Sequence, residues 1–295
     1  MRKLTGSSRI LLASLCVFVA LGGCRHTQET RPLVAPPAKH SIRSDRLLVQ
    51  SNFKLPKNHP LITDLIQLRG QVSAMLDLPE ERKEVVVYLF NNETEYTQYL
   101  DATYPGLPKR RAYFVGTPRE LSVYTYWGER IQEDLRHEYT HGLLHSCLKR
   151  VPLWLDEGLA EYFEVIGPEP GRVNSDYARN LVTLLGNNWR PDLKRLEQLD
   201  KFEQMQRIDY QEAWAWVHFM LHSSPDTRET LVAYLRDLEE EADARPLSLR
   251  LEENGLKVGD RFMNYIATLR TTRLSLGPST SLEDNPHNRH SDLAH

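Results

Sequence analysis

Two short segments near the middle of the chain constrain its fold more than any other feature. The first is HEYTH, residues 137–141, and the second is WLDEGLAEY, residues 154–162. Residues 129–149 contain no proline and place apolar side chains at helical spacing, so we expect a helix there. Because residues four apart share one helix face, His137 and His141 can direct two imidazole nitrogens to one point. This arrangement indicates a metal site, and zinc is the ion that it suits best.

A catalytic zinc ion takes three protein ligands and keeps one position open for water, so a third ligand must come from elsewhere. Fifteen residues separate His141 from Glu157. In that interval the first helix can end, the chain can turn near Pro152, and a second helix can pack back across the first, with Gly158 permitting close approach. We therefore expect Glu157 to complete a site for one Zn²⁺ per chain.

Two other acidic residues of the second segment can orient the metal ligands. Glu161 follows Glu157 by one helical turn, so its carboxylate can accept the second ring N–H of a ligating histidine and fix its tautomer. Asp156 can do the same, and the sequence does not decide between them, although the spacing favours Glu161. His145 continues the four-residue spacing but is rotated about 80° from His137. We expect His145 on the helix surface or behind the ligands.

HEYTH followed by WLDEGLAEY resembles the gluzincin branch of zinc metallopeptidases, the peptidase MA-like group, in which HExxH precedes a helix with a glutamate ligand in a W-L-(N/D)-E-G context. The resemblance covers about residues 130–163. It implies that His137, His141 and Glu157 bind zinc and that Glu138 is the general base. In the implied reaction a zinc-activated water attacks an amide carbonyl, and Glu138 moves the water proton to the leaving amine.

The resemblance also implies an α+β fold of the zincin type, with a small mixed sheet and helices in an upper lobe and an all-helical lower lobe. The upper lobe would span about residues 45–150 and the lower lobe about residues 151–270, with zinc in the cleft between them. The strand just before the metal helix, residues 121–127, would lie at the sheet edge and pair with extended substrate backbone.

The apolar patterns agree with that order of elements. They predict strands at 47–51 and 85–90, helices at 60–78 and 91–100, and a hairpin of 111–116 with 121–127. Past residue 167 they predict helices only, at 174–185, 192–200, 210–222, 228–240 and 260–269.

Members of the resembled group stabilise the transition-state oxyanion with a tyrosine or histidine from the lower lobe. Tyr210, at the start of a predicted helix, is the first candidate for this donor. His218, two turns further along the same helix, is the second, and the third possibility is that Tyr210 only packs in the core.

Two other functions are compatible with these residues. One is a catalytically silent, lipid-anchored binding module on a peptidase scaffold, and the other is a zinc hydrolase of a non-peptide bond. The presence of Glu138 beside all three expected ligands favours a peptidase. Whether the substrate is a protein, a short peptide or a cell-wall stem peptide stays open.

The first 23 residues have the organisation of a secretory signal peptide. Basic residues at the start precede an apolar run at 10–21, which is too short to span a bilayer. The sequence LGGC that ends at Cys24 resembles the lipobox of bacterial lipoproteins, in which the cysteine is lipidated and becomes the new N-terminus. We therefore expect an exported protein that is anchored to a bacterial membrane through Cys24.

Composition excludes several classes of protein. Cys16 leaves with the signal peptide and Cys24 is used by lipid, so Cys147 has no disulfide partner. A net charge of −3 with 26% charged residues gives no indication of nucleic-acid binding. Residues 24–44 are rich in proline and polar residues and predict a disordered tether, and residues 271–295 predict a disordered tail.

Overall fold

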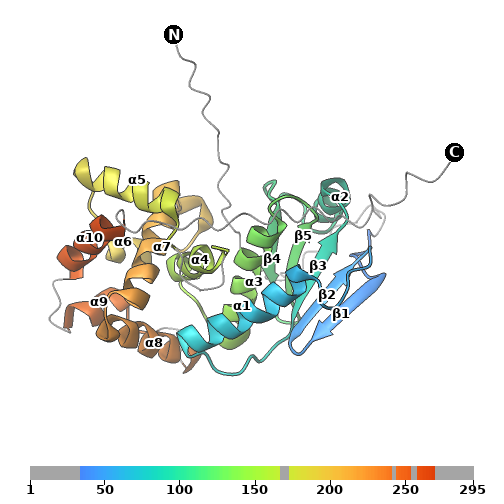
Figure 1. Ribbon diagram of the computed structural model, residues 1–295, viewed down its shortest axis with the longest axis horizontal. Helices are drawn as coiled ribbons and strands as arrows, with labels where there is room; N and C mark the ends of the chain where they lie inside the picture. The colour runs from blue at the N-terminus through green and yellow to red at the C-terminus, as the bar shows by residue number, and fades with distance from the viewer. Residues whose placement is uncertain (1–33, 167–172, 241–243, 254–257, 270–295) are drawn as a thin grey trace, which may run out of the picture.

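The computed structural model describes residues 34–166, 173–240, 244–253 and 258–269. Within these ranges the protein has an α+β fold with a five-stranded sheet and ten α-helices. The sheet lies at one end of the molecule and α5–α10 at the other, with α3 and α4 between them (Figure 1). None of the helices in these ranges is long and apolar enough to cross a membrane. The expected signal peptide, Cys24 and tail lie outside the described residues.

The sheet is mixed, as the sequence predicts. Its strands are β1 (His40–Ser44), β2 (Leu47–Ser51), β3 (Val85–Phe90), β4 (Ala112–Gly116) and β5 (Leu121–Tyr126). The spatial order is β1-β2-β3-β5-β4, in which β2, β3 and β5 are parallel and the outer strands β1 and β4 are antiparallel to their neighbours.

The position of β5 corrects one expectation. The strand before the metal helix is not at the sheet edge, because β5 pairs with β3 on one side and with β4 on the other. The buried residues of β5 suit an internal strand that is covered on both faces. The hairpin partner β4 is therefore one of the two edge strands, and β1 is the other.

The position of β1 corrects a second expectation. Residues 40–44 were assigned to the disordered tether, but they form β1 and pair along their whole length with β2. The turn between the two strands has Asp45 in the left-handed region, with φ of 51°. Only Ile42 in the middle of β1 is buried, so the strand lacks the apolar alternation that would have indicated it.

Three helices cover the sheet. Helices α1 (Pro60–Leu76) and α3 (Ile131–Cys147) pack against each other, and α3 lies on β3, β4 and β5. Helix α2 (Glu93–Thr103) packs on β3 and β5 over a second apolar cluster that includes Tyr96, Tyr99 and Tyr124. A Cβ on Gly142 would lie 2.7 Å from Cγ1 of Val85, so glycine allows α3 to sit directly on β3.

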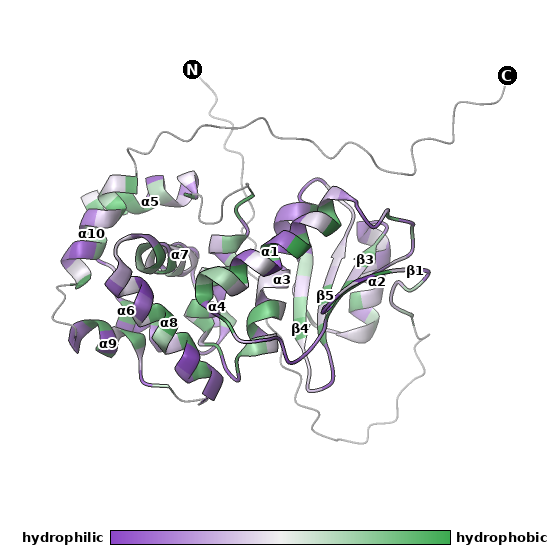
Figure 2. Cartoon of the chain, turned by 60° about the horizontal axis from the view of Figure 1, so that its bottom comes forward, coloured by the Kyte–Doolittle hydropathy of each residue, from purple (hydrophilic) through white to green (hydrophobic). Residues whose placement is uncertain are grey.

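After Arg150 the described residues form helices and no strand, in agreement with the sequence patterns. The α-helices are α4 (Leu153–Phe163), α5 (Ser175–Gly186), α6 (Leu193–Glu197), α7 (Arg207–His222), α8 (Pro225–Glu240), α9 (Leu247–Glu253) and α10 (Val258–Leu269). The short helix α9 and a 3₁₀ helix at Phe202–Gln204 were not predicted. Helix α4 is buried from Trp154 to Phe163, and hydrophobic segments alternate with hydrophilic ones along it in Figure 2.

Helix α4 packs closely on α7, and one glycine makes this possible. A Cβ on Gly158 would lie 2.7 Å from the backbone oxygen of Ala213 in α7. The sequence predicted a close approach at Gly158 but paired it with α3. One continuous apolar core joins both halves of the molecule, so α4 is held between α3 and α7.

Candidate metal centre

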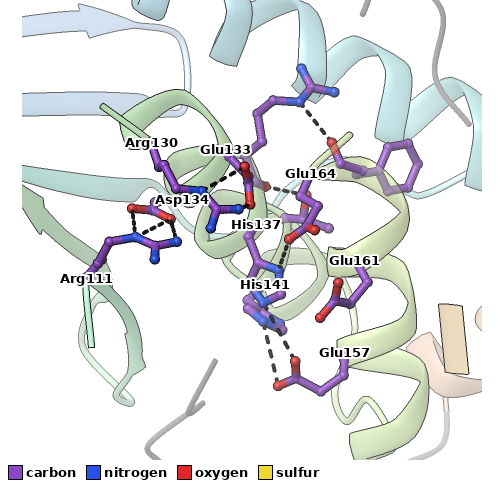
Figure 3. Close-up of polar contacts among 12 residues, drawn as sticks. Arg111, Arg130, Glu133, Asp134, His137, His141, Glu157, Glu161 and Glu164 are labelled. Atoms are coloured by element: carbon purple, nitrogen blue, oxygen red, sulfur yellow. Dashed lines mark hydrogen bonds and ion pairs between the residues drawn. The ribbon is translucent and has the colours of Figure 1, made fainter. Parts of the chain in front are cut away.

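Helix α3 brings together the two histidines and the glutamate of HEYTH. His137, Glu138 and His141 are all fully buried, because α3 is enclosed by the sheet and by α4. The start of α3 is held by Asp134, which accepts two-pronged hydrogen bonds from Arg111 at 2.7–3.2 Å (Figure 3). The expected i, i+4 helix face is therefore present and rigidly supported.

Helix α4 directs Glu157 at the two imidazoles, as Figure 3 shows. Its Oε2 lies 3.6 Å from Nε2 of His137, and its Oε1 lies 3.9 Å from Nε2 of His141. One candidate ligand atom from each of the three residues lies within 4.8 Å of the others. The structure thus brings together the three side chains that the sequence predicted as ligands.

The donor atoms of this cluster fit a metal ion. Nε2 of His137, Nε2 of His141 and both carboxylate oxygens of Glu157 are buried and have no hydrogen-bond partner among the described residues. Burying such atoms without a partner costs roughly 1–3 kcal/mol each, and a metal ion bound between them could offset this cost. Two imidazoles and one carboxylate match the three-ligand set of a catalytic zinc site.

Two carboxylates hold the far sides of the imidazoles. Oε2 of Glu164 lies 2.9 Å from Nδ1 of His137, and Oδ1 of Asp156 lies 2.9 Å from Nδ1 of His141. The other oxygen of Asp156 lies 3.0 Å from Nε2 of His145, which places His145 behind the ligands. A carboxylate at Nδ1 favours a proton on that nitrogen and leaves the Nε2 lone pair for a metal.

Glu164 is the residue that the sequence analysis missed, and it takes the role that was expected of Glu161. It follows Glu157 by seven residues, close to two full turns, so its spacing was the signal that could have identified it. Glu161 instead accepts a hydrogen bond of 2.8 Å from the hydroxyl of Tyr177 in α5. Glu161 remains near the cluster, because it forms a second candidate group with His137 and Glu164.

The charges within the cluster shift several pKa values. Burial alone would lower the pKa of His137, but the carboxylates of Glu157 and Glu164 raise it well above its ordinary value. Burial would raise the pKa of Asp156, but His141 and His145 hold it far below its ordinary value. Asp156 is therefore an anion that favours the protonated Nδ1 of His141.

Tyr210 in α7 is close enough to the expected ligand Glu157 to feel its charge. It is 3% exposed, and burial followed by the charge of Glu157 raises the pKa of its hydroxyl. Among the described residues, no hydrogen bond is made by this hydroxyl. By contrast, Nδ1 of His218 lies 2.7 Å from the hydroxyl of Tyr265 in α10. Of the two candidate oxyanion donors, Tyr210 is the one with a hydroxyl near Glu157.

The cluster defines a buried two-histidine, one-carboxylate site that can hold a metal ion. Residues 133–247 match the model of a family described as "Protein of unknown function (DUF1570)". The matched region runs from the first turn of α3 to the start of α9 and contains every residue of the cluster. No curated protein matches the chain.

Proposed function

We propose that the protein is a zinc-dependent metallopeptidase of the gluzincin type that hydrolyses peptide bonds at the cell envelope. The observation that supports this most directly is the convergence of three buried ligand groups, His137, His141 and Glu157, with Glu138 on the same helix turn. In this proposal the sheet beside α3 and the helical half beyond α4 would be the two lobes of a zincin fold.

A zinc ion held by these residues would polarise the carbonyl of the scissile amide and lower the pKa of the attacking water. Glu138 takes a proton from that water and passes it to the leaving amine nitrogen. Burial and, after it, the charge of Glu138 raise the pKa of Tyr96. Burial also raises the pKa of Tyr113 to about 12, where the charge of Arg110 lowers this pKa and the charge of Glu138 raises it. The charge of Glu138 therefore acts on residues of α2 and β4.

Two further groups complete the proposed reaction. The Tyr210 hydroxyl donates a hydrogen bond to the carbonyl oxygen as that oxygen becomes anionic. Such a hydrogen bond stabilises the transition state most where water is excluded. Among the described strands β4 pairs only with β5, so its outer side is the proposed partner of the extended substrate backbone. The role of peptide-binding edge thus moves from residues 121–127 to β4, which is the outer strand on this side of the sheet.

The location of the proposed enzyme follows from its first residues. A signal peptide that ends before a lipidated Cys24 would export the protein and anchor it to a bacterial membrane. Its substrates would then be peptides or proteins at the cell envelope.

The test uses purified full-length protein that has been loaded with zinc and freed of excess metal. We expect about one zinc per chain by elemental analysis and hydrolysis of some members of a mixed peptide library. Glu138→Gln, which keeps all three ligands, is the control against a contaminating protease. Bound zinc without hydrolysis of any peptide would reject the peptidase and favour the binding module or a hydrolase of non-peptide bonds.

A further inference from the structure

Arg110 lies just before the edge strand β4, and its charge is unmatched in the described part of the chain. Its Nη1 atom is buried and has no hydrogen-bond partner, and no described carboxylate forms an ion pair with it. The next residue, Arg111, is in contrast fully engaged by Asp134. Burying part of a guanidinium without an acceptor is costly, so a position of this kind indicates a binding function.

The guanidinium of Arg110 contacts one tyrosine and acts electrostatically on another. It stands over the ring of Tyr113 in β4, with 5.8 Å between its central carbon and the ring centroid. Its positive charge also acts on the hydroxyl of Tyr210, which feels the charge of Glu157 as well. Arg110 stands just before β4 in the sheet half of the molecule, whereas Tyr210 lies in α7 in the helical half.

A pocket of about 290 Å³ opens at this end of β4. Its lining includes Arg110, Tyr113 and, from α2, Tyr96. The hydroxyl of Tyr96 is a second buried donor without a hydrogen-bond partner among the described residues. The volume is at the lower limit for ligand pockets, so it suits one side chain or one terminal residue and not a whole peptide.

Two acidic residues also line this pocket, and they act against a bound anion. Glu93 and Asp101 are exposed to solvent, where water and salt weaken their repulsion. Arg110 is half-buried, so its attraction for an anion is screened less. The remaining basic residues of the lining are the exposed Lys109 and the paired Arg111.

We propose that Arg110 binds a carboxylate of the peptide substrate, so that the enzyme selects peptides with a negative charge close to the scissile bond. This proposal rests on the proposed peptidase function. The planar guanidinium can donate two parallel hydrogen bonds to a carboxylate. A neutral amide in place of the carboxylate would bind the guanidinium more weakly. The carboxylate is either the free C-terminus or the side chain of Asp or Glu.

Two pairs of peptides distinguish these two sources. One cleaved library peptide is made with a free or an amidated C-terminus, and with Glu or Gln at the positions next to the cleaved bond. We expect the intact enzyme to prefer the carboxylate member of one pair by roughly 10 to 100-fold in kcat/KM, as a charged hydrogen bond allows.

The variant Arg110→Met keeps the aliphatic stem over Tyr113 and removes the charge. We expect it to bring the ratio of the two kcat/KM values close to one, mainly by lowering kcat/KM for the carboxylate peptide. Arg110→Lys keeps the positive charge and should retain part of the preference. This variant therefore distinguishes loss of the charge from loss of folding at position 110. Arg119→Met, at an exposed arginine on the turn at the other end of β4, should leave the preference unchanged.

Equal cleavage of both members of each pair by the wild type would overturn the proposal. So would an Arg110→Met enzyme that loses acidic and neutral peptides to the same extent. Binding of the same peptides to zinc-loaded Glu138→Gln, measured by calorimetry, separates the two proposals. Tighter binding of the acidic peptide that depends on Arg110, without hydrolysis by the wild type, would reject the peptidase and keep the carboxylate site.

Discussion

Nδ1 of His137 and Oε2 of Glu164 lie 2.9 Å apart although 27 positions separate the two residues in the chain. The contact joins the middle of α3 to the C-terminal end of α4. The other nitrogen of His137, Nε2, lies 3.6 Å from Oε2 of Glu157. One helical turn further along α3, Nδ1 of His141 lies 2.9 Å from Oδ1 of Asp156. The two histidines are thus held by different carboxylates of the same helix.

The first prediction separates the ligand from the residues that orient the site. Glu157→Ala should lose most of the zinc, because it removes one of three ligands. Glu164→Gln should keep the ligands and weaken zinc affinity by roughly 10 to 100-fold, because the His137 ring loses its charged partner. Competition with a chromogenic chelator measures both.

Glu161→Gln and the exposed Glu203→Gln serve as comparisons for these variants. Neither should change zinc affinity as much as Glu164→Gln does. A site that is emptied by Glu161→Gln and left full by Glu157→Ala would mean that the roles of the two residues are exchanged.

The second prediction concerns the proposed general base. Glu138→Gln should leave the zinc content unchanged and abolish peptide hydrolysis, since the amide cannot accept the water proton. Zinc analysis and turnover are measured on the same sample. Near-normal hydrolysis by this variant would exclude Glu138 as the base.

The third prediction concerns the Tyr210 hydroxyl. Tyr210→Phe should keep the ring, its packing and the zinc but remove a hydrogen bond made mainly in the transition state. We expect kcat to fall by roughly 100 to 1,000-fold, which is about 2.7–4 kcal/mol, with little change in KM.

Tyr265→Phe is the matched control for this experiment, because it removes the hydroxyl that contacts His218. Its kcat should stay at the wild-type level. Unchanged kcat in Tyr210→Phe would return Tyr210 to a packing role, and a loss in Tyr265→Phe would direct attention to His218.

The fourth prediction concerns the packing of α4 on α7. Gly158→Ala would place a methyl group 2.7 Å from the backbone oxygen of Ala213, so a helix must shift. Overpacking of this kind costs about 1–3 kcal/mol in the free energy of unfolding. Gly70→Ala in α1, where a Cβ meets nothing within 4 Å, should instead stabilise by about 0.5–1 kcal/mol.

Urea-induced unfolding of the two variants measures these opposite effects. Equal stability of Gly158→Ala and the wild type would show that α4 and α7 can separate without cost. Because α4 presents Glu157, we also expect Gly158→Ala to weaken zinc binding.

The fifth prediction concerns the N-terminal cysteine. Cys24→Ser should release the protein from the membrane fraction without changing its zinc content, because the lipid would be attached outside the described fold. Fractionation followed by immunodetection measures the release, and Cys16→Ser should remain in the membrane fraction. A Cys24→Ser protein that stays with the membrane would require another anchor.

The sequence by itself determined those features that depend on near neighbours in the chain. Residues four apart on a helix share a face whatever the helix packs on, so His137 and His141 were predictable as a pair. The apolar run of β3 and the break near Pro152 were equally local. The order of strands followed by helices could therefore be predicted, and the structure confirms it. The mixed sheet was implied by the resemblance.

Only the tertiary structure decided which elements meet. The expected Asp156 and Glu161 lie on α4 and the unexpected Glu164 caps its C-terminal end. The packing of α4 on α3 decides which carboxylate reaches which imidazole. The edge position of β4 depends on β5 pairing with β3, a contact between residues more than 30 positions apart. Such pairings depend on the packing of whole surfaces, and this packing produces no periodic pattern in the sequence. For the same reason the unmatched charge of Arg110 can be recognised only in the folded chain.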